Sequence, residues 1–146
     1  MMRRFLIVVT TFVALLVMMA LAPAGATPPS SVEIVVPGFE GPFTATGSAV
    51  DDGVICDSGV VSTTGVKAAG FQSNRVLILT VGKQFVCDDV SGTFFAKLQV
   101  KIDGEGASFN WVIKEGTGDY VDLHGSGGGF VVPVNTDVYQ GRVHID

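Results

Sequence analysis

The sequence predicts an all-β domain. The favoured architecture is a closed eight-stranded antiparallel β-barrel, with a β-sandwich as the alternative. Apolar and polar residues alternate with period two in several segments of the 146-residue chain, and no segment after Pro29 shows the 3.6-residue period of an amphipathic helix. Turns rich in glycine and aspartate separate segments rich in Val, Thr, Ile and Phe. Antiparallel strands with one apolar face must either stack as two sheets or close into a barrel. Because closure removes the exposed edges of the sheet, we favour the barrel.

The N-terminal segment has the organisation of a secretory signal peptide. Arg3 and Arg4 precede an apolar run over residues 5–22, and Ala24-Gly25-Ala26 supplies a small-x-small cleavage site. We expect cleavage after Ala26, which leaves residues 27–146 as one domain that is secreted, extracellular or periplasmic, with no stable membrane insertion. A retained membrane anchor is the alternative, because an apolar helix of this length nearly crosses a hydrocarbon core of about 30 Å.

The predicted strands follow one another along the mature chain. The clearest is 93–103, which places Phe94, Ala96, Leu98, Val100 and Ile102 on one face, followed by a tight turn at 103–106. Its partner, 107–114, points Phe109, Trp111 and Ile113 inward. The remaining strands are predicted near 32–36, 43–50, 54–64, 75–81, 85–87, 129–134 and 138–145. Residues 65–74 form the one long connection, with a helical turn at Lys67-Ala68-Ala69.

Two cysteines, Cys56 and Cys87, are present, both in the mature part. An exported chain meets an oxidising compartment, where an even pair normally forms a bridge. We therefore predict a structural Cys56–Cys87 disulfide that stabilises the fold by about 3 to 4 kcal/mol. A redox or metal role is the alternative, but the chain has no Cys-x-x-Cys, and His124 and His144 show no ligand spacing.

Composition and motifs exclude several functional classes. With 9 basic and 14 acidic residues and a formal charge of −5, the chain is not a nucleic-acid binder. The glycine run 125–129 lacks the Lys-Ser/Thr of a phosphate-binding loop, and no nucleophile accompanies the histidines. The acids lack the spacing of a calcium loop. We predict no catalytic residue, no metal and no cofactor. The acids near the two cysteines are Asp51, Asp52, Asp57, Asp88 and Asp89.

One stretch resembles a known group of barrels. Residues 109–127 contain an aromatic strand, the turn Gly116-Thr117-Gly118-Asp119-Tyr120 and the pattern Leu123-His124-Gly125-Ser126-Gly127, and residues 139–146 resemble a closing strand. The pattern is similar to that of secreted bacterial proteins related to the allene oxide cyclase and dirigent barrels. The resemblance implies an eight-stranded barrel with an apolar cavity, often oligomeric in the plant members. Dirigent proteins tend to continue this turn into Ala-Arg-Gly, so no catalytic residue is carried over.

The sequence leaves three functional hypotheses. The leading one is non-enzymatic binding of a small apolar molecule by the barrel, because the inward residues mix large aromatic rings with small side chains. Core packing of the same rings is the alternative. The second hypothesis is a structural or interaction protein of the cell envelope, with a homo-oligomeric face near Phe95. The third, a cyclase-like or dirigent-like enzyme that guides a reactive intermediate, is implied only by the resemblance. The candidate ligand-binding residues are Phe94, Phe109, Trp111 and Tyr139.

Overall fold

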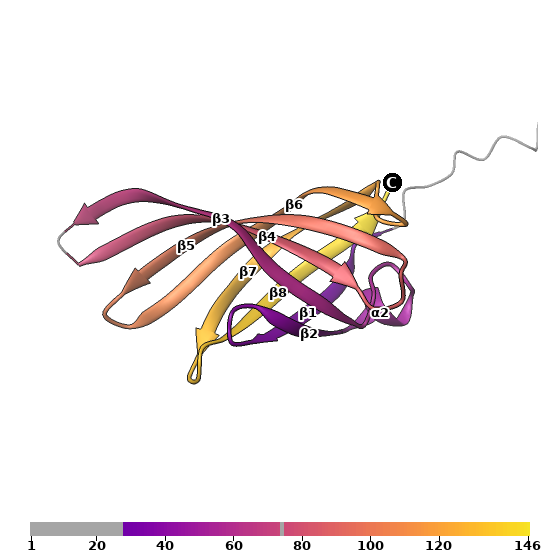
Figure 1. Ribbon diagram of the computed structural model, residues 1–146, viewed down its shortest axis with the longest axis horizontal. Coiled ribbons are helices and arrows are strands. Elements are labelled where there is room, and N and C mark those ends of the chain that lie inside the picture. The colour runs from indigo at the N-terminus through magenta and orange to yellow at the C-terminus, as the bar shows by residue number, and fades with distance from the viewer. Residues whose placement is uncertain (1–27, 74) are drawn as a thin grey trace, which may run out of the picture.

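The computed structural model describes residues 28–73 and 75–146, and they form a closed antiparallel barrel in which each strand pairs with the next and β8 pairs with β1 (Figure 1). The predicted signal peptide, residues 1–26, lies outside the described residues. A one-turn helix, α2 (Ser48–Asp51), follows the second strand. The strands are β1 (Ser30–Pro37), β2 (Gly41–Thr46), β3 (Ser58–Ser73), β4 (Val76–Cys87), β5 (Gly92–Asp103), β6 (Gly106–Gly118), β7 (Leu123–Val132) and β8 (Thr136–Ile145).

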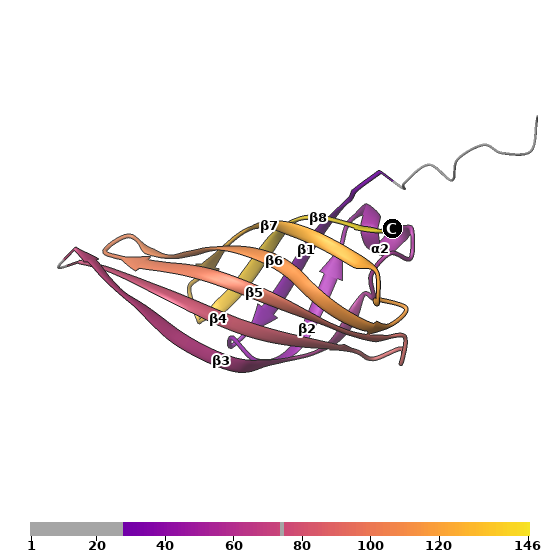
Figure 2. The same cartoon turned by 90° about the horizontal axis from the view of Figure 1, so that it is seen from above.

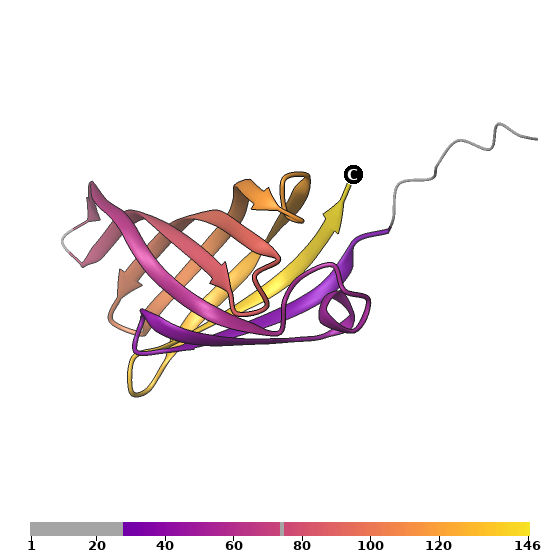
Figure 3. The same ribbon diagram turned by 45° about the vertical axis from the view of Figure 1, so that its right-hand side comes forward.

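The barrel closes between its first and last strands. The β1–β8 register runs from Ser30 opposite Val143 to Pro37 opposite Thr136, so both termini of the folded domain lie at the same end. The long hairpins β3–β4 and β5–β6 extend beyond the other strands on one side, as Figures 1 and 2 show. We call the end formed by the β1–β2, β5–β6 and β7–β8 turns the open end. The view in Figure 3 looks more nearly along the barrel and shows the strands curving around it.

Side-chain alternation is confirmed in the two clearest strands. Phe94, Ala96 and Leu98 of β5 are buried while Lys97 and Gln99 are exposed. In β6 the inward residues Phe109, Trp111 and Ile113 are buried, and their outward neighbours Ser108, Asn110 and Lys114 are exposed. The predicted choice of a barrel over a sandwich is also confirmed.

The connections differ from prediction in the first half of the chain. The strand expected over 43–50 ends at Thr46, because Gly47 adopts a positive φ of 109° and α2 follows. A Cβ on Gly47 would lie 2.6 Å from the Ser31 carbonyl oxygen, so the turn requires glycine. The strand expected over 54–64 begins only at Ser58.

The long connection predicted over 65–74 is wrong, because most of it is the second half of β3. Lys67 lies opposite Thr80 in the ladder, so no helical turn forms at Lys67-Ala68-Ala69. The β3–β4 register shifts between Thr63 and Gly65, between Ala68 and Gly70, and between Phe71 and Ser73. Each such irregularity interrupts period-two alternation, which is why the segment does not read as a strand. The predicted strands 75–81 and 85–87 are likewise one strand, β4.

Strand β7 begins earlier than expected and contains the glycine run. A Cβ on Gly129 would overlap the ring of Phe109, and one on Gly141 of β8 would lie 2.5 Å from Cζ2 of Trp111. The glycines therefore leave space for two aromatic rings against the inner wall of the barrel. The sequence left a turn and a coiled strand open for residues 125–129; the structure shows the strand, and packing overrides the low strand preference of glycine.

The predicted disulfide joins Cys56 and Cys87 at the end of the barrel opposite the open end. Cys56 follows α2, and Cys87 is the last residue of β4. The buried Tyr120 hydroxyl lies 3.5 Å from Cys87 Sγ and 2.8 Å from Ser91 Oγ, so the β6–β7 turn covers the bridge. Within residues 28–73 and 75–146, no helix is long and apolar enough to cross a membrane.

Candidate functional site

Aromatic rings fill the half of the barrel nearer the disulfide. Phe85 of β4 stacks on Phe94 of β5 with ring centroids 4.7 Å apart, and it meets Tyr139 of β8 edge-on at 5.8 Å. Tyr139 also contacts Phe109 and Trp111 of β6, at 4.7 and 6.4 Å between centroids. These rings leave at most a few per cent of their surface exposed. The barrel is therefore solid at this level.

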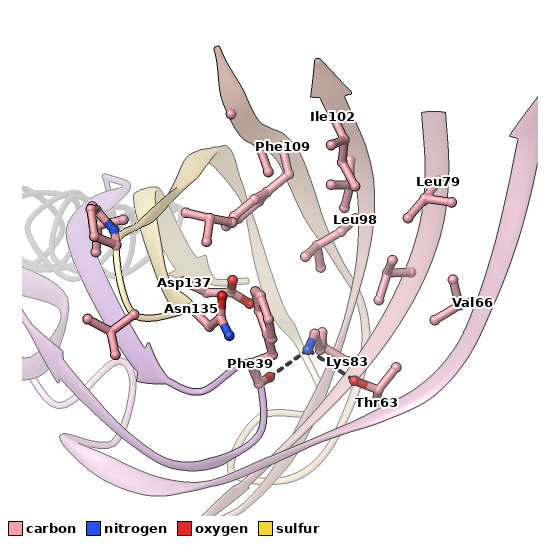
Figure 4. Close-up of a pocket in the computed structure, with 18 of the residues that line it drawn as sticks. Phe39, Thr63, Val66, Leu79, Lys83, Leu98, Ile102, Phe109, Asn135 and Asp137 are labelled. Carbon is pink, nitrogen blue, oxygen red and sulfur yellow. Dashed lines mark hydrogen bonds between the residues drawn. The ribbon is translucent and has the colours of Figure 1, made fainter. Parts of the chain in front are cut away.

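A cavity of about 740 Å³ occupies the other half and opens to solvent at the open end (Figure 4). This volume falls within the range of small-molecule pockets, roughly 300 to 1,000 Å³. Its wall consists mainly of aliphatic side chains that point inward from β3, β4, β5, β6 and β7. They include Val66, Leu79, Val81, Leu98, Val100, Ile102, Ala107 and Val131, and Val132 also lines the cavity, at the end of β7.

The rim of the cavity exposes apolar residues on two neighbouring turns. Phe39 of the β1–β2 turn and Val134 of the β7–β8 turn both line the cavity, and Val134 is 90% exposed. Both have positive φ, 68° and 71°, which a branched side chain such as valine rarely adopts. The Gly38 N–H donates to the Asn135 carbonyl at 2.9 Å and ties the two turns together. The rim is thus held in a strained form that presents apolar surface to solvent.

A buried lysine lies in the wall of the cavity. Lys83 of β4 is only 4% exposed, and its Nζ donates to the Phe39 carbonyl at 2.6 Å and to Thr63 Oγ1 at 3.0 Å (Figure 4). Among the described residues, no carboxylate lies within 4.0 Å of this ammonium. Burial therefore lowers the pKa of Lys83, and the more distant carboxylates of Asp137 and Glu40 offset this only in part.

A buried carboxyl group also lines the cavity, from β8. Asp137 is 5% exposed, and its Oδ2 accepts a hydrogen bond of 3.4 Å from the Tyr139 hydroxyl. Burial raises the pKa of Asp137, while Lys83 and the Tyr139 hydrogen bond act in the opposite direction. Burial likewise raises the pKa of Tyr139, which stays a neutral donor. The site thus combines an aliphatic wall with two titratable groups whose charged forms are destabilised by burial.

The structure brings the four predicted ligand-binding residues into one aromatic cluster. Of these, Phe109 lines the cavity directly. Phe94, Trp111 and Tyr139 pack beneath it, and Tyr139 reaches the cavity through its hydrogen bond to Asp137. The indole N–H of Trp111 donates to the Gly128 carbonyl at 3.1 Å, so this ring is fixed in the core.

Sequence reasoning missed Lys83 and Asp137. Lys83 lies between the strands predicted over 75–81 and 85–87. It is two residues from both Val81 and Phe85, so in one continuous strand all three side chains lie on the inward face. Asp137 was assigned to a turn, yet it precedes Tyr139 by two residues on the inward face of β8. If the alternation of inward and outward side chains is continued through both segments, each of them places one charged residue inside the barrel.

The other polar clusters lie away from the cavity. His124 and His144 contact Asp146 at 3.2 and 3.4 Å, at the far ends of β7 and β8 from the open end. In the part of the chain that the structure describes, no group of three or more His, Cys, Asp or Glu is arranged to hold a metal ion. No family model matches the chain, and no curated protein or solved structure matches it.

Proposed function

We propose that this protein binds a small, largely apolar molecule that carries one polar group, in the cavity at the open end of the barrel. The observation that carries the proposal is the cavity itself: about 740 Å³ of space with a mainly aliphatic wall, open at one end. Lys83 and Asp137 are the polar groups that orient the bound molecule. A few fixed polar groups in an apolar pocket are the usual basis of small-molecule specificity.

The chemistry of the wall specifies the ligand class. An ammonium has three N–H donors, and two described acceptors occupy Lys83, so one donor is available to a ligand oxygen. Asp137 offers a further oxygen to the same cavity, from β8. Burial disfavours the charged form of both groups, and the same apolar surroundings disfavour a ligand with a strong charge. An alcohol, ketone or aldehyde with an aliphatic or ring body fits this wall.

The proposal is tested by titration with N-phenylnaphthylamine, an uncharged apolar fluorophore that emits strongly out of water, and with decanol as competitor. We expect saturable emission with one site per chain and displacement by decanol. Val100, half-buried in the cavity wall, is replaced by Trp to fill the space; its exposed neighbour Gln99→Trp is the matched control. Binding should weaken by about tenfold or more in the first variant only, because it loses about 2 kcal/mol of apolar contact.

Equal binding by Val100→Trp and Gln99→Trp would overturn the assignment of the cavity, and an absence of saturable binding would overturn the function. Trp111 emission alone is a poorer reporter, because the indole lies below the cavity rather than in its wall.

The compartment is part of the proposal. The Cys56–Cys87 disulfide is compatible with an oxidising extracellular or periplasmic space. The basic and apolar segments before Ala26 support export with cleavage. Mass spectrometry of the chain recovered outside the cytoplasm should give Thr27 as the first residue; retention of residues 1–26 in the membrane fraction would contradict export with cleavage. The resemblance to the allene oxide cyclase and dirigent barrels stays a prediction.

A further inference from the structure

We propose that Lys83 is a covalent binding site that captures aldehydes of the ligand class described above, by forming an imine with a carbonyl carbon inside the cavity. This rests on the proposed function, because the aldehyde must first enter the cavity. It adds a chemical step and a reacting atom, the Nζ of Lys83.

The position of Lys83 differs from that of every other lysine in the chain. Its side chain is 4% exposed and lines a cavity large enough for an aliphatic aldehyde. Its Nζ contacts two neutral oxygens, those of Phe39 and Thr63, and no carboxylate within ion-pair distance among the described residues. A neutral amine is the nucleophilic form, and an apolar site without an ion pair favours it. The exposed lysines are Lys67, Lys97, Lys101 and Lys114.

The surroundings of Lys83 suit the reaction. Thr63 and Ala96 are its cross-strand neighbours on β3 and β5, so a small side chain on one side leaves room beside the amine. The Phe39 carbonyl and Thr63 hydroxyl hold Nζ in place as hydrogen-bond acceptors. Figure 4 shows Nζ between these two oxygens, with Leu98 on the neighbouring strand β5. An aldehyde bound along the aliphatic wall is therefore held beside a fixed nucleophile.

The step balances without an oxidant or reductant. The lone pair of the neutral amine forms a bond to the carbonyl carbon, and the carbonyl π electrons move to oxygen, which takes up the first of the two nitrogen protons. The resulting carbinolamine loses its hydroxyl as water, and the nitrogen loses its second proton as the C=N bond forms. In total, one amine and one aldehyde give one imine and one water, which leaves through the open end. Asp137, the other buried charged residue that lines the cavity, is the group available there for proton exchange.

The test uses the mature chain, decanal and cyanoborohydride, which reduces an imine to a stable amine. Intact mass and peptide mapping then give the number and positions of alkyl groups. We expect one adduct on Lys83, formed at least about tenfold faster than on any exposed lysine. Lys97→Met, which removes an exposed lysine from the next strand, should leave the amount and rate of the Lys83 adduct unchanged. Lys83→Met should lose the adduct.

Competition keeps the test decisive if Lys83→Met folds poorly after losing its bond to Phe39. In the wild-type chain, excess decanol should suppress the Lys83 adduct and leave slow labelling of exposed lysines unaltered. Fluorophore binding with adducts spread evenly over the lysines would overturn the imine site and leave the proposed function standing. A Lys83 adduct that decanol does not suppress would also overturn it, because capture would then not proceed through the cavity. Loss of both fluorophore binding and selective labelling would overturn both proposals.

Discussion

At the scale of single residues, the unusual feature is charge placed inside a small barrel. Asp137 and Lys83 are the buried charged residues that the structure describes, and both line the same cavity. Burial of a charged group destabilises a fold unless the group is paired or neutralised. An aliphatic wall without them would fold at least as well, so the presence of these two groups supports the proposal that the cavity binds a ligand.

Asp137 predicts a specific dependence of stability on pH. Its pKa is raised from the ordinary 3.8 mainly by burial, so the folded chain holds this proton more tightly than the unfolded chain. The contribution of Asp137 is therefore complete below pH 3.8 and is lost as the pH rises through the folded pKa. Urea unfolding at a series of pH values should show that Asp137→Asn removes this decline.

Glu40 is the matched control for Asp137, because its contribution to stability changes with pH in the opposite direction. The pKa of Glu40 is lowered, first by its hydrogen bonds with Thr63, so its contribution is present above the ordinary 4.5 and is lost as the pH falls. Glu40→Gln should therefore flatten the rise in stability with pH that Glu40 causes. Identical pH profiles for wild type and Asp137→Asn would show that Asp137 titrates as an exposed carboxyl.

Gly129 lies where an added methyl group would overpack the interior of the barrel. A Cβ there would overlap the Phe109 ring, which forms part of the cavity wall, whereas a Cβ on Gly128 would meet its nearest atom at an ordinary 3.7 Å. Gly129→Ala should destabilise the fold by about 1 to 3 kcal/mol through overpacking. Gly128→Ala, on the outer face of the same strand, should be neutral or slightly stabilising. Thermal unfolding of the two variants measures the difference; equal melting temperatures would contradict it.

At the scale of strands and turns, the sequence predicts regular elements well and irregular ones poorly. Strands β5 and β6 follow from uninterrupted alternation and a tight turn, and their inward faces are those expected. Strand β3 has three register shifts, and β7 has a glycine run, so neither shows the pattern of a strand. Lys83 lies in a part of β4 that the sequence does not predict as strand, and Asp137 lies just before the predicted start of β8, so both polar residues of the cavity were missed, whereas its aromatic floor was predicted.

The disulfide is an element-scale constraint whose effect can be measured. It links the segment after α2 to the end of β4, across 31 residues of sequence. Replacing both cysteines, Cys56→Ala with Cys87→Ala, should reduce the free energy of unfolding by about 3 to 4 kcal/mol, chiefly because the unfolded chain gains freedom. Urea unfolding of the wild type in dithiothreitol should match the double variant. A variant as stable as the oxidised wild type would contradict this account.

At the scale of the whole molecule, the barrel divides into two halves with different physical roles. One half is packed with aromatic rings and closed by the disulfide and Tyr120; the other is hollow, with an apolar rim. A fully packed barrel would be more stable, since cavities cost dispersion contacts. The fold thus concentrates its packing at the end with the disulfide, and the other end encloses the cavity.

This division predicts that ligand binding and the disulfide stabilise the chain independently. Cys87 lies four residues beyond Lys83 on β4, about 13 Å along an extended strand, and perturbations this far apart are usually additive. Decanol at about 100 times its Kd should raise the free energy of unfolding by about 2.7 kcal/mol in the wild type. The cysteine double variant should show the same increment in urea unfolding, while Val100→Trp should show almost none. An increment that vanishes with the disulfide would mean that the hollow half is formed only when the packed half is locked, and the two halves would then be one cooperative unit.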